Sequence, residues 1–480
     1  MEKCCPVSEA KPPEKSNQVS FFEKVAYGFG GGGEVLMANL LFLLAYPIYQ
    51  AGLGVDARWL GWAIGIPRLW DAVIDPFIGN MSDNAKTRWG RRKPFMFVGA
   101  IATGIFCMLL WMPPANASKL IIFAYFFVFS MLYFTSYAWF AIPWNGLGYE
   151  LSSDYDERIN VMSFKVFLMS AVGTLLIPLA LPMCFWFGHN KIEGVRVVGM
   201  IFGAFIILFG IVPALFCKER IHKEQQKILL KDAFKYTFKN KPFMIACGVI
   251  LFTVLGIYVS IPLQYYINMS YVLPGNEGLT AKFLMYCSYT SGIVGFLCVP
   301  IINLLSHRYG KKLVLQAGLL FVIAGTLLSW VFYTPNHPYL QLATAFIISP
   351  GWICVFLILA AIVADICDLD ELTTNRRREG MFGAIFNLFL KVGVALTMVV
   401  SGYVISWTGY DSARPIQLAS TIFKIRFMFA IVPLGVLAIA LVCTFMYPLT
   451  KQKVLEIRSA LDARENARIN AGDARIAHES

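Results

Sequence analysis

The sequence predicts an all-α integral membrane protein with twelve transmembrane helices in two six-helix bundles. Of its 480 residues, 58% are hydrophobic and only 15% are charged, and the mean hydropathy is +0.62. Apolar runs of about 20 residues, the length that crosses a bilayer, recur along the whole chain. Because soluble domains are about 25% charged, these values exclude a water-soluble protein. A basic motif that occurs twice indicates that the helices are divided into two bundles.

The apolar runs are separated by short breaks that are charged or rich in Pro and Gly, and each run is long enough for one membrane helix. The expected spans lie near residues 25–51, 57–80, 95–113, 119–144, 161–187, 195–217, 243–268, 279–305, 313–333, 339–365, 381–409 and 422–447.

Lysine and arginine are distributed unevenly between the two sets of alternating connections. The set that includes both tails carries thirty Lys and Arg residues, whereas the opposite set carries six. Since Lys and Arg accumulate on the cytoplasmic side, we expect both termini in the cytoplasm and the protein in the cell (inner or plasma) membrane. The formal net charge of +12 then faces the lipid bilayer surface, and no nucleic-acid partner is expected.

One basic motif occurs at equivalent places in the two parts of the chain. RWGRR at residues 88–92 follows the second span, and RYGKK at 308–312 follows the eighth, 220 residues later. Parallel repeats of six spans are typical of secondary transporters that bind their substrate between the halves. The alternative is that two basic loops arose independently. The expected units are a cytoplasmic N-tail (1–24), an N-terminal bundle (25–217), a cytoplasmic basic linker (218–242), a C-terminal bundle (243–447) and a cytoplasmic C-tail (448–480).

The second span contains three ionisable residues, Arg68, Asp71 and Asp75. Charges inside a membrane are costly unless they are paired or face water, so they usually mark a functional site. Offsets of three and four place these side chains on one helix face. Asp71 and Asp75 are therefore predicted to bind one small cation, either Na⁺ as a metal ligand pair or a proton. A purely structural pair with Arg68 is the alternative, but one Arg cannot balance two acids.

Other polar residues within the spans are candidates for binding the transported molecule. Glu34 follows four consecutive glycines, which favour either close helix approach or an unwound turn. Lys391 lies near mid-depth of the eleventh span and needs an acidic partner or a polyhydroxyl ligand, whereas Lys165 lies nearer an interface. Aromatic side chains such as Tyr137 are suited to stack on a sugar face. The predicted substrate-binding set is Glu34, Arg68, Tyr137, Asn145, Lys165 and Lys391.

Acidic and basic residues also cluster at the predicted cytoplasmic ends of the spans. We interpret them as a solvated ion-pair network that holds the cytoplasmic side closed in one state and breaks in the other. The predicted gate residues are Asp83, Arg88, Arg91, Arg92, Asp365, Asp368 and Arg377.

The segment from Arg68 to Pro76 (RLWDAVIDP), followed by RWGRRKP at 88–94, resembles the glycoside–pentoside–hexuronide:cation symporters. These belong to the major facilitator superfamily, with melibiose permease as the model member. The resemblance covers nearly the whole chain and implies the major facilitator fold, alternating access and uphill import driven by Na⁺, H⁺ or Li⁺. It also implies that Asp71 and Asp75 are the cation carboxylates and that Lys165 and Lys391 lie near the cation and sugar sites.

The chain departs from melibiose permease in its fourth span. The sugar-binding aspartate falls on Ala141, the threonine associated with Na⁺ on Ala138, and the sugar-stacking tryptophan on Asn145. Sugar specificity therefore does not carry over, and the loss of the threonine favours H⁺ over Na⁺. Glu34 is a candidate replacement for a first-helix acid, displaced by one position.

The leading hypothesis is a monomeric, cation-coupled importer of a sugar, glycoside or hexuronide, with a monovalent cation as its second cargo and no cofactor. The alternative is a symporter of a lysolipid or other amphiphile. An apolar cleft that opens sideways between the helices would indicate such a cargo. A non-transporting sensor is a third, against which the intact Asp71 and Asp75 argue. The sequence contains neither HExxH nor GxSxG, so we expect no enzymatic activity.

Overall fold

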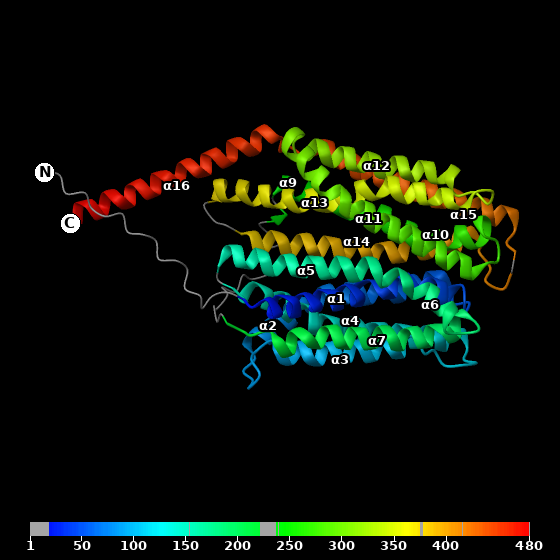
Figure 1. Cartoon of the computed structure of the whole chain (residues 1–480). Helices are drawn as coiled ribbons and strands as arrows, with labels where there is room; N and C mark the ends of the chain where they lie inside the picture. Colours follow the sequence, from blue (N-terminus) through cyan, green and yellow to red (C-terminus); the bar gives the residue numbers. More distant parts are fainter. Residues whose placement is uncertain are drawn as a thin grey trace.

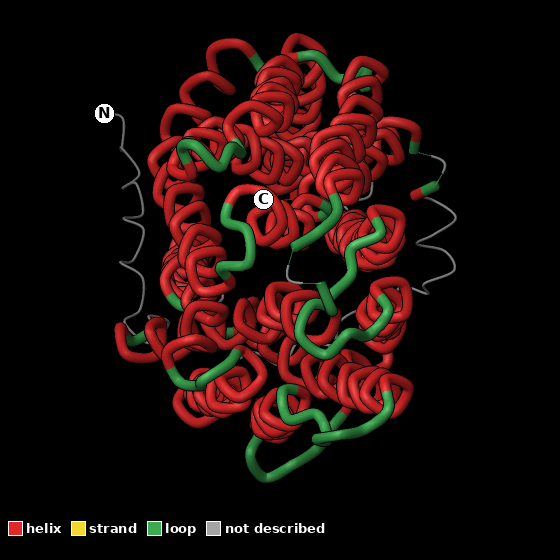
Figure 2. Tube along the Cα trace, turned by 90° about the vertical axis from the view of Figure 1, so that its right-hand side faces the viewer, coloured by secondary structure: helices red, strands yellow, loops and turns green. Residues whose placement is uncertain are grey.

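The computed structural model describes residues 19–152, 154–220, 237–238, 240–374, 378–414 and 416–479, and within these ranges all regular secondary structure is helical. The predicted N-tail and basic linker lie largely outside the described residues. Long helices lie side by side with their axes roughly parallel (Figure 1). The helices of the second half lie above those of the first in Figure 1. Figure 2 views the molecule along these helices, turned by 90°.

The first half contains six spans, four of which are single uninterrupted helices. Its elements are α1 (Phe21–Ala45) continued by the π-helix η2 (Tyr46–Gln50), α2 (Ala57–Asn84), α3 (Lys93–Leu110), α4 (Lys119–Glu150), α5 (Tyr155–Leu175) continued through η3 (Ile177–Leu179) into α6 (Ala180–Trp186), and α7 (Lys191–Phe216).

The second half repeats this plan and ends in an additional helix. Its elements are α9 (Lys241–Tyr258) continued through α10 (Ser260–Ile267) into the π-helix η4 (Asn268–Val272), α11 (Glu277–Tyr309), α12 (Lys311–Phe332), η5 (Pro338–Leu340) leading into α13 (Gln341–Thr374), α14 (Glu379–Thr408), α15 (Ala419–Met446) and α16 (Lys451–Glu479).

The structure agrees with the twelve expected spans. Within the described ranges, eleven helical segments are long and apolar enough to cross a membrane. The twelfth, α2, is 28 residues long, but its charged side chains keep it below that level of hydropathy. Several helices extend beyond the expected limits, such as α4 to Glu150 and α13 to Thr374. The reason is that a helix does not end where its apolar run ends, because its backbone hydrogen bonds continue into the polar surface.

The repeated basic motif has two features in common in both halves, a glycine with positive φ and a basic residue after it that pairs with an acid. Gly90 and Gly310 adopt φ values of +105° and +89°, which glycine accepts without strain. Arg91 pairs with Glu150 at the end of the fourth span, and Lys311 pairs with Asp365 near the end of the tenth. These equivalent contacts indicate that the motif is a true structural repeat.

The four consecutive glycines permit close packing and no unwinding occurs, because α1 continues through them as an α-helix. A Cβ atom on Gly31 would lie 2.7 Å from Met169 Cγ, and one on Gly32 would lie 2.9 Å from Val172 Cγ2. Only glycine therefore lets α5 approach α1 this closely, and this approach brings Lys165 toward Glu34.

The helices run between two ends of the molecule. We name the end that holds the start of α1, residues 85–92 and the start of α16 the terminal end, and the opposite end, with residues 51–56, 111–118, 187–190 and 409–414, the distal end. The terminal end is at the left of Figure 1. The two halves meet chiefly where α2 packs against α14.

Candidate functional site

An ion-pair cluster joins the two halves near mid-depth, where α2 meets α14. Lys391 Nζ of α14 lies 2.8 Å from Asp71 Oδ2 and 2.5 Å from Asp75 Oδ2, both on α2. Arg68 Nη1 lies 3.0 Å from the same Asp71 oxygen. The Asp71 side chain is fully buried, so its charge depends on these two cations for compensation. As their spacing predicts, Arg68, Asp71 and Asp75 lie on one face of α2. A lysine from the other half pairs with both aspartates there.

Each aspartate of this cluster retains one oxygen with no partner. Asp71 Oδ1 and Asp75 Oδ1 are both buried and accept no hydrogen bond within the described residues. Pro76, inside α2, lacks an N–H and so leaves the Ala72 carbonyl without its helical donor. These three oxygens are of the type that Na⁺ binds, and a carboxylate oxygen also accepts a proton.

Arg68 is enclosed by aromatic rings of the first half. Its guanidinium carbon lies 6.0, 5.4 and 5.7 Å from the ring centres of Phe42, Phe134 and Tyr137. The Tyr137 hydroxyl in turn donates a hydrogen bond of 3.2 Å to Glu34 Oε1. Cation–π contacts are strongest where water is excluded, so these rings hold Arg68 in position beside Asp71.

A second polar group lies toward the terminal end of the same cluster. Lys165 Nζ donates to Asn145 Oδ1 at 2.6 Å and lies 4.5 Å from the centre of the Trp144 ring. Glu34 interacts electrostatically with Lys165, Arg68 and Lys391. The structure therefore brings together all the substrate-site residues expected from the sequence, and the three acids of the cluster face three bases.

Within the described residues, no group of three or more His, Cys, Asp or Glu side chains could hold a metal ion. Two carboxylates alone do not complete the shell of a bound Na⁺, which requires further oxygen ligands. For a metal cargo these would come from backbone carbonyls such as that of Ala72, from water or from the transported molecule.

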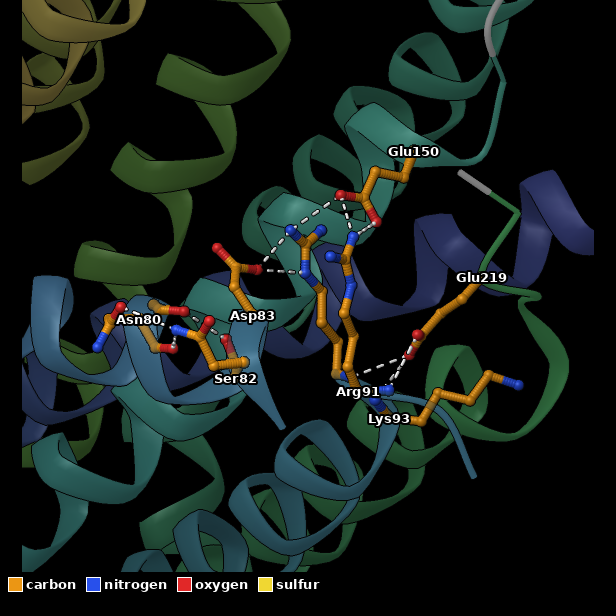
Figure 3. A network of polar contacts seen from close by, with 10 residues as sticks. Asn80, Ser82, Asp83, Arg91, Lys93, Glu150 and Glu219 are labelled. Carbon is orange, nitrogen blue, oxygen red and sulfur yellow. Dashed lines mark hydrogen bonds and ion pairs between the residues drawn. The ribbon is translucent and has the colours of Figure 1, made fainter. Parts of the chain in front are cut away.

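Three of the predicted gate residues of the first half, Asp83, Arg91 and Arg92, lie in a network at the terminal end (Figure 3). Arg92 pairs with Asp83 at 2.7 Å and with Glu150 at 3.0 Å, and Arg91 pairs with Glu150 at 2.5 Å. Glu219 accepts hydrogen bonds from the backbone N–H groups of residues 91–93. Arg88 is exposed on the loop.

The predicted gate residues of the second half form a separate network. Asp365, which is 2% exposed, accepts an ion pair from Lys311 at 2.7 Å and one from Arg458 of α16 at 3.1 Å. Arg458 also approaches Asp368 at 3.5 Å. Arg377 lies outside the described residues. The ion pairs named here each lie within one half, and the role of these networks in gating remains a prediction.

Sequence reasoning missed four partners in these networks: Glu150, Glu219, Lys311 and Arg458. The repeat contained a signal for one of them, because Lys311 occupies the motif position of Arg91. Arg458 carries no such signal, since its contact depends on where α16 lies after the last span.

At the distal end, by contrast, hydrogen bonds and an ion pair connect the two halves. Lys191 Nζ of α7 lies 2.6 Å from Glu277 Oε1 of α11. The Tyr266 hydroxyl donates to Gln50 Oε1 at 2.5 Å, and the Tyr46 hydroxyl donates to the Met398 carbonyl at 2.6 Å. The halves are thus joined at the distal end and at mid-depth.

Comparison with known proteins assigns this architecture to a family. Residues 26–451 match the family model described as MFS/sugar transport protein. The putative glycoside/cation symporter YagG of Escherichia coli (strain K12) is 28% identical, with 92% of this chain and 95% of the relative covered. The isoprimeverose transporter of Lactiplantibacillus pentosus is 24% identical, with 96% and 97% covered.

A solved structure shares the fold at lower sequence identity. It is a bacterial homolog to the human lysosomal transporter Spinster, in an inward-facing and occupied conformation. The TM-score is 0.67 at 15% identity, and the match covers 90% of this chain and 97% of that chain. This likeness shows the fold alone.

Proposed function

The chain belongs to the family of MFS/sugar transport proteins, of the glycoside–pentoside–hexuronide:cation symporter type, and we propose that it imports a sugar, glycoside or hexuronide together with H⁺ or Na⁺. The observation that carries this proposal is the position of Lys391 between Asp71 and Asp75. A membrane transporter without coupling has no use for two acids near mid-depth that are bridged by a base from its other half.

In the proposed mechanism, the Lys391 ammonium and the coupling cation compete for the same carboxylates. Lys391 compensates Asp71 and Asp75 when no cation is bound, so the site never holds two uncompensated charges. When Na⁺ or a proton binds, Lys391 is released from α2, and the ion-pair connection between the halves at mid-depth is lost. The cation thereby changes the relative free energies of the two transport states.

The substrate is proposed to bind beside this cluster, between Glu34, Tyr137, Asn145 and Lys165. Carboxylate, amide, hydroxyl and ammonium groups converge there, as the many hydroxyl groups of a sugar require. The Lys165 ammonium also provides a contact for the carboxylate of a hexuronide. The similarity to an isoprimeverose transporter supports a glycoside over an apolar cargo.

We further propose that the terminal end faces the cytoplasm, as the distribution of Lys and Arg indicates. The conformation described here, with the distal contacts formed, is then the one that releases its cargo to the cytoplasm. Alternating access requires a second state in which the distal contacts break and the terminal ends of the halves meet.

The test is uptake of labelled glycosides and hexuronides into proteoliposomes under an imposed Na⁺ gradient or an imposed H⁺ gradient. We expect concentrative uptake under one gradient and its loss in Asp71→Asn. Asp462→Asn is the matched control, because it removes an exposed carboxylate of α16 and should transport normally.

No concentrative uptake of any sugar by folded protein would contradict the proposal. Equal uptake by Asp71→Asn and wild type would contradict the assignment of the cation site while leaving the choice of substrate standing.

A further inference from the structure

A cavity of about 540 Å³ lies at the distal end, outside the site described above. Its walls come from both halves: Gln50, Gly54, Trp59 and Lys119 from the first, and residues 405–406 and 410–412 from the second. Cavities of roughly 300–1,000 Å³ are typical of small-molecule sites. Because the cavity spans the boundary between the halves, it has this form only while the distal end is closed.

Three charged residues line the cavity, two aspartates that pair with arginines outside its wall and one lysine. Asp56 is paired with Arg58 at 2.8 Å, and Asp411 is paired with Arg414 at 3.1 Å. Lys119, at the start of α4, forms no ion pair or hydrogen bond with the described residues. One ammonium group is therefore left to attract an anion.

Two polar groups from different halves converge at one point of the cavity. A Cβ atom on Gly54 would lie 3.3 Å from Lys119 Nζ and 3.4 Å from Ser412 Oγ. Gly54 itself has φ +70°, a conformation that favours glycine. A side chain at this position would crowd both groups, so glycine lets the ammonium and the hydroxyl lie beside the same point of the backbone, where one oxyanion can contact both.

The remaining wall fits the rest of a hydroxylated ligand. Gln50 is 6% exposed, and its carbonyl is occupied by Tyr266, so its amide N–H groups remain available as donors toward the cavity. Trp59 and Phe123 form an edge-to-face pair, with ring centres 5.6 Å apart, along one side. An aromatic surface beside polar donors is suited to the apolar face of a sugar ring.

We propose that this distal cavity binds an oxyanion carried on a hydroxyl-rich ligand, with Lys119 and Ser412 holding the anionic group. Two sources supply this chemistry: a soluble hexuronate, or the headgroup of an anionic lipid such as phosphatidylglycerol. Since residues of both halves form the site, the ligand binds the distally closed state and shifts the population toward it. The proposal requires the closed distal end but not the transport activity proposed above.

The test is calorimetric titration of the purified full-length protein with glucuronate, in neutral detergent, with glucose as the uncharged comparison. We expect Lys119→Gln to weaken the binding of glucuronate at least about tenfold, because it removes a hydrogen bond between charged groups. Ser412→Ala should weaken it less. Lys282→Gln is the matched control, since it removes an exposed lysine of α11 that lies outside the cavity.

Nanodiscs of phosphatidylcholine, with or without phosphatidylglycerol, distinguish the two sources. Competition by phosphatidylglycerol that depends on Lys119 identifies the lipid headgroup, whereas glucuronate binding that is unchanged by phosphatidylglycerol identifies the soluble ligand. Glucuronate held at the central site contributes equally in wild type and Lys119→Gln, so the difference between them reports the distal cavity. If neither probe shows Lys119-dependent binding, the proposal is overturned.

Discussion

The distal and terminal ends of the protein contain similar side chains that make different connections. At the distal end, Lys191 and Glu277 pair across the boundary between the halves. At the terminal end, Arg91 pairs with Glu150 and Lys311 with Asp365, each within one half. Ion pairs within a half move with that half as a unit, so they stabilise it without resisting the motion. Only contacts between the halves set the balance between two transport states.

Glycines on α14 show the same contrast in packing. A Cβ on Gly402, near the distal end, would overlap the Ala57 carbonyl oxygen of α2. Gly380 and Gly383, near the terminal end of the same helix, have no atom of another described segment within 4 Å of the equivalent position. The two halves therefore pack closely at the distal end. At the terminal end, the described segments leave space beside these two glycines of α14.

The largest effect is expected for Lys391, which connects the two halves at mid-depth. Lys391→Gln leaves Asp71 and Asp75 with Arg68 as their remaining cation and should lower cation-driven accumulation about a hundredfold. Lys391→Arg should retain part of the activity. Uptake into proteoliposomes is the measurement, with the exposed Lys424→Gln as control. Normal accumulation by Lys391→Gln would show that the halves communicate without this ion pair.

A comparison of two glycines tests the difference in packing directly. Gly402→Ala should lower the midpoint of thermal unfolding of the detergent-solubilised protein, because overpacking costs about 1–3 kcal/mol. Gly383→Ala should leave the midpoint unchanged or raise it, since alanine favours the helix. Equal destabilisation by both variants would mean that the terminal end is as tightly packed as the distal end.

Removal of the distal ion pair should favour opening of that end. Glu277→Gln leaves Lys191, with a side chain only 7% exposed, without its partner carboxylate. We expect roughly tenfold faster labelling of an Asn39→Cys variant by a membrane-impermeant thiol reagent added from the distal side. Asn39 lies on the half-buried face of α1, distal to Glu34.

The charge exchange Lys191→Glu/Glu277→Lys should restore slow labelling, and protein without Asn39→Cys gives the background from native cysteines. Labelling at the wild-type rate in Glu277→Gln would remove this pair from the contacts that hold the distal end closed.

The smallest effect is expected for Arg458→Gln at the terminal end. Arg458 is 53% exposed, and an exposed ion pair contributes about 0–1 kcal/mol. Because Asp365 keeps its pair with Lys311, we expect less than about a threefold change in the initial rate of uptake. A tenfold change would show that the contact of α16 with Asp365 influences the motion of the halves, which would weaken the contrast between the ends.

Some features of the site followed directly from sequence spacing. Arg68, Asp71 and Asp75 had to share one face of α2, because helical residues three and four apart are neighbours. The two basic motifs had to follow equivalent spans, and both glycines adopt positive φ. The charged α2 was predicted as a span from its apolar run, although its charged residues keep it below the hydropathy of the other eleven spans among the described residues.

The partners of these residues could not be derived in the same way. Lys391 is 320 residues from Asp71 in the chain. The sequence indicated that Lys391 needs an acidic partner but did not identify which acidic residue this is. The glycines before Glu34 were compatible with an unwound turn, and only the position of α5 against them shows that they serve close packing.

The sequence by itself determined the membrane helices, the two repeats and the buried charges, because hydropathy and helical spacing are local properties. Only the tertiary structure decided which charges meet, which end of the molecule is closed and where a cavity remains between the halves. These features depend on the packing of α2 against α14 and on the Lys191–Glu277 ion pair between α7 and α11, and contacts between such distant segments are not encoded in any local pattern.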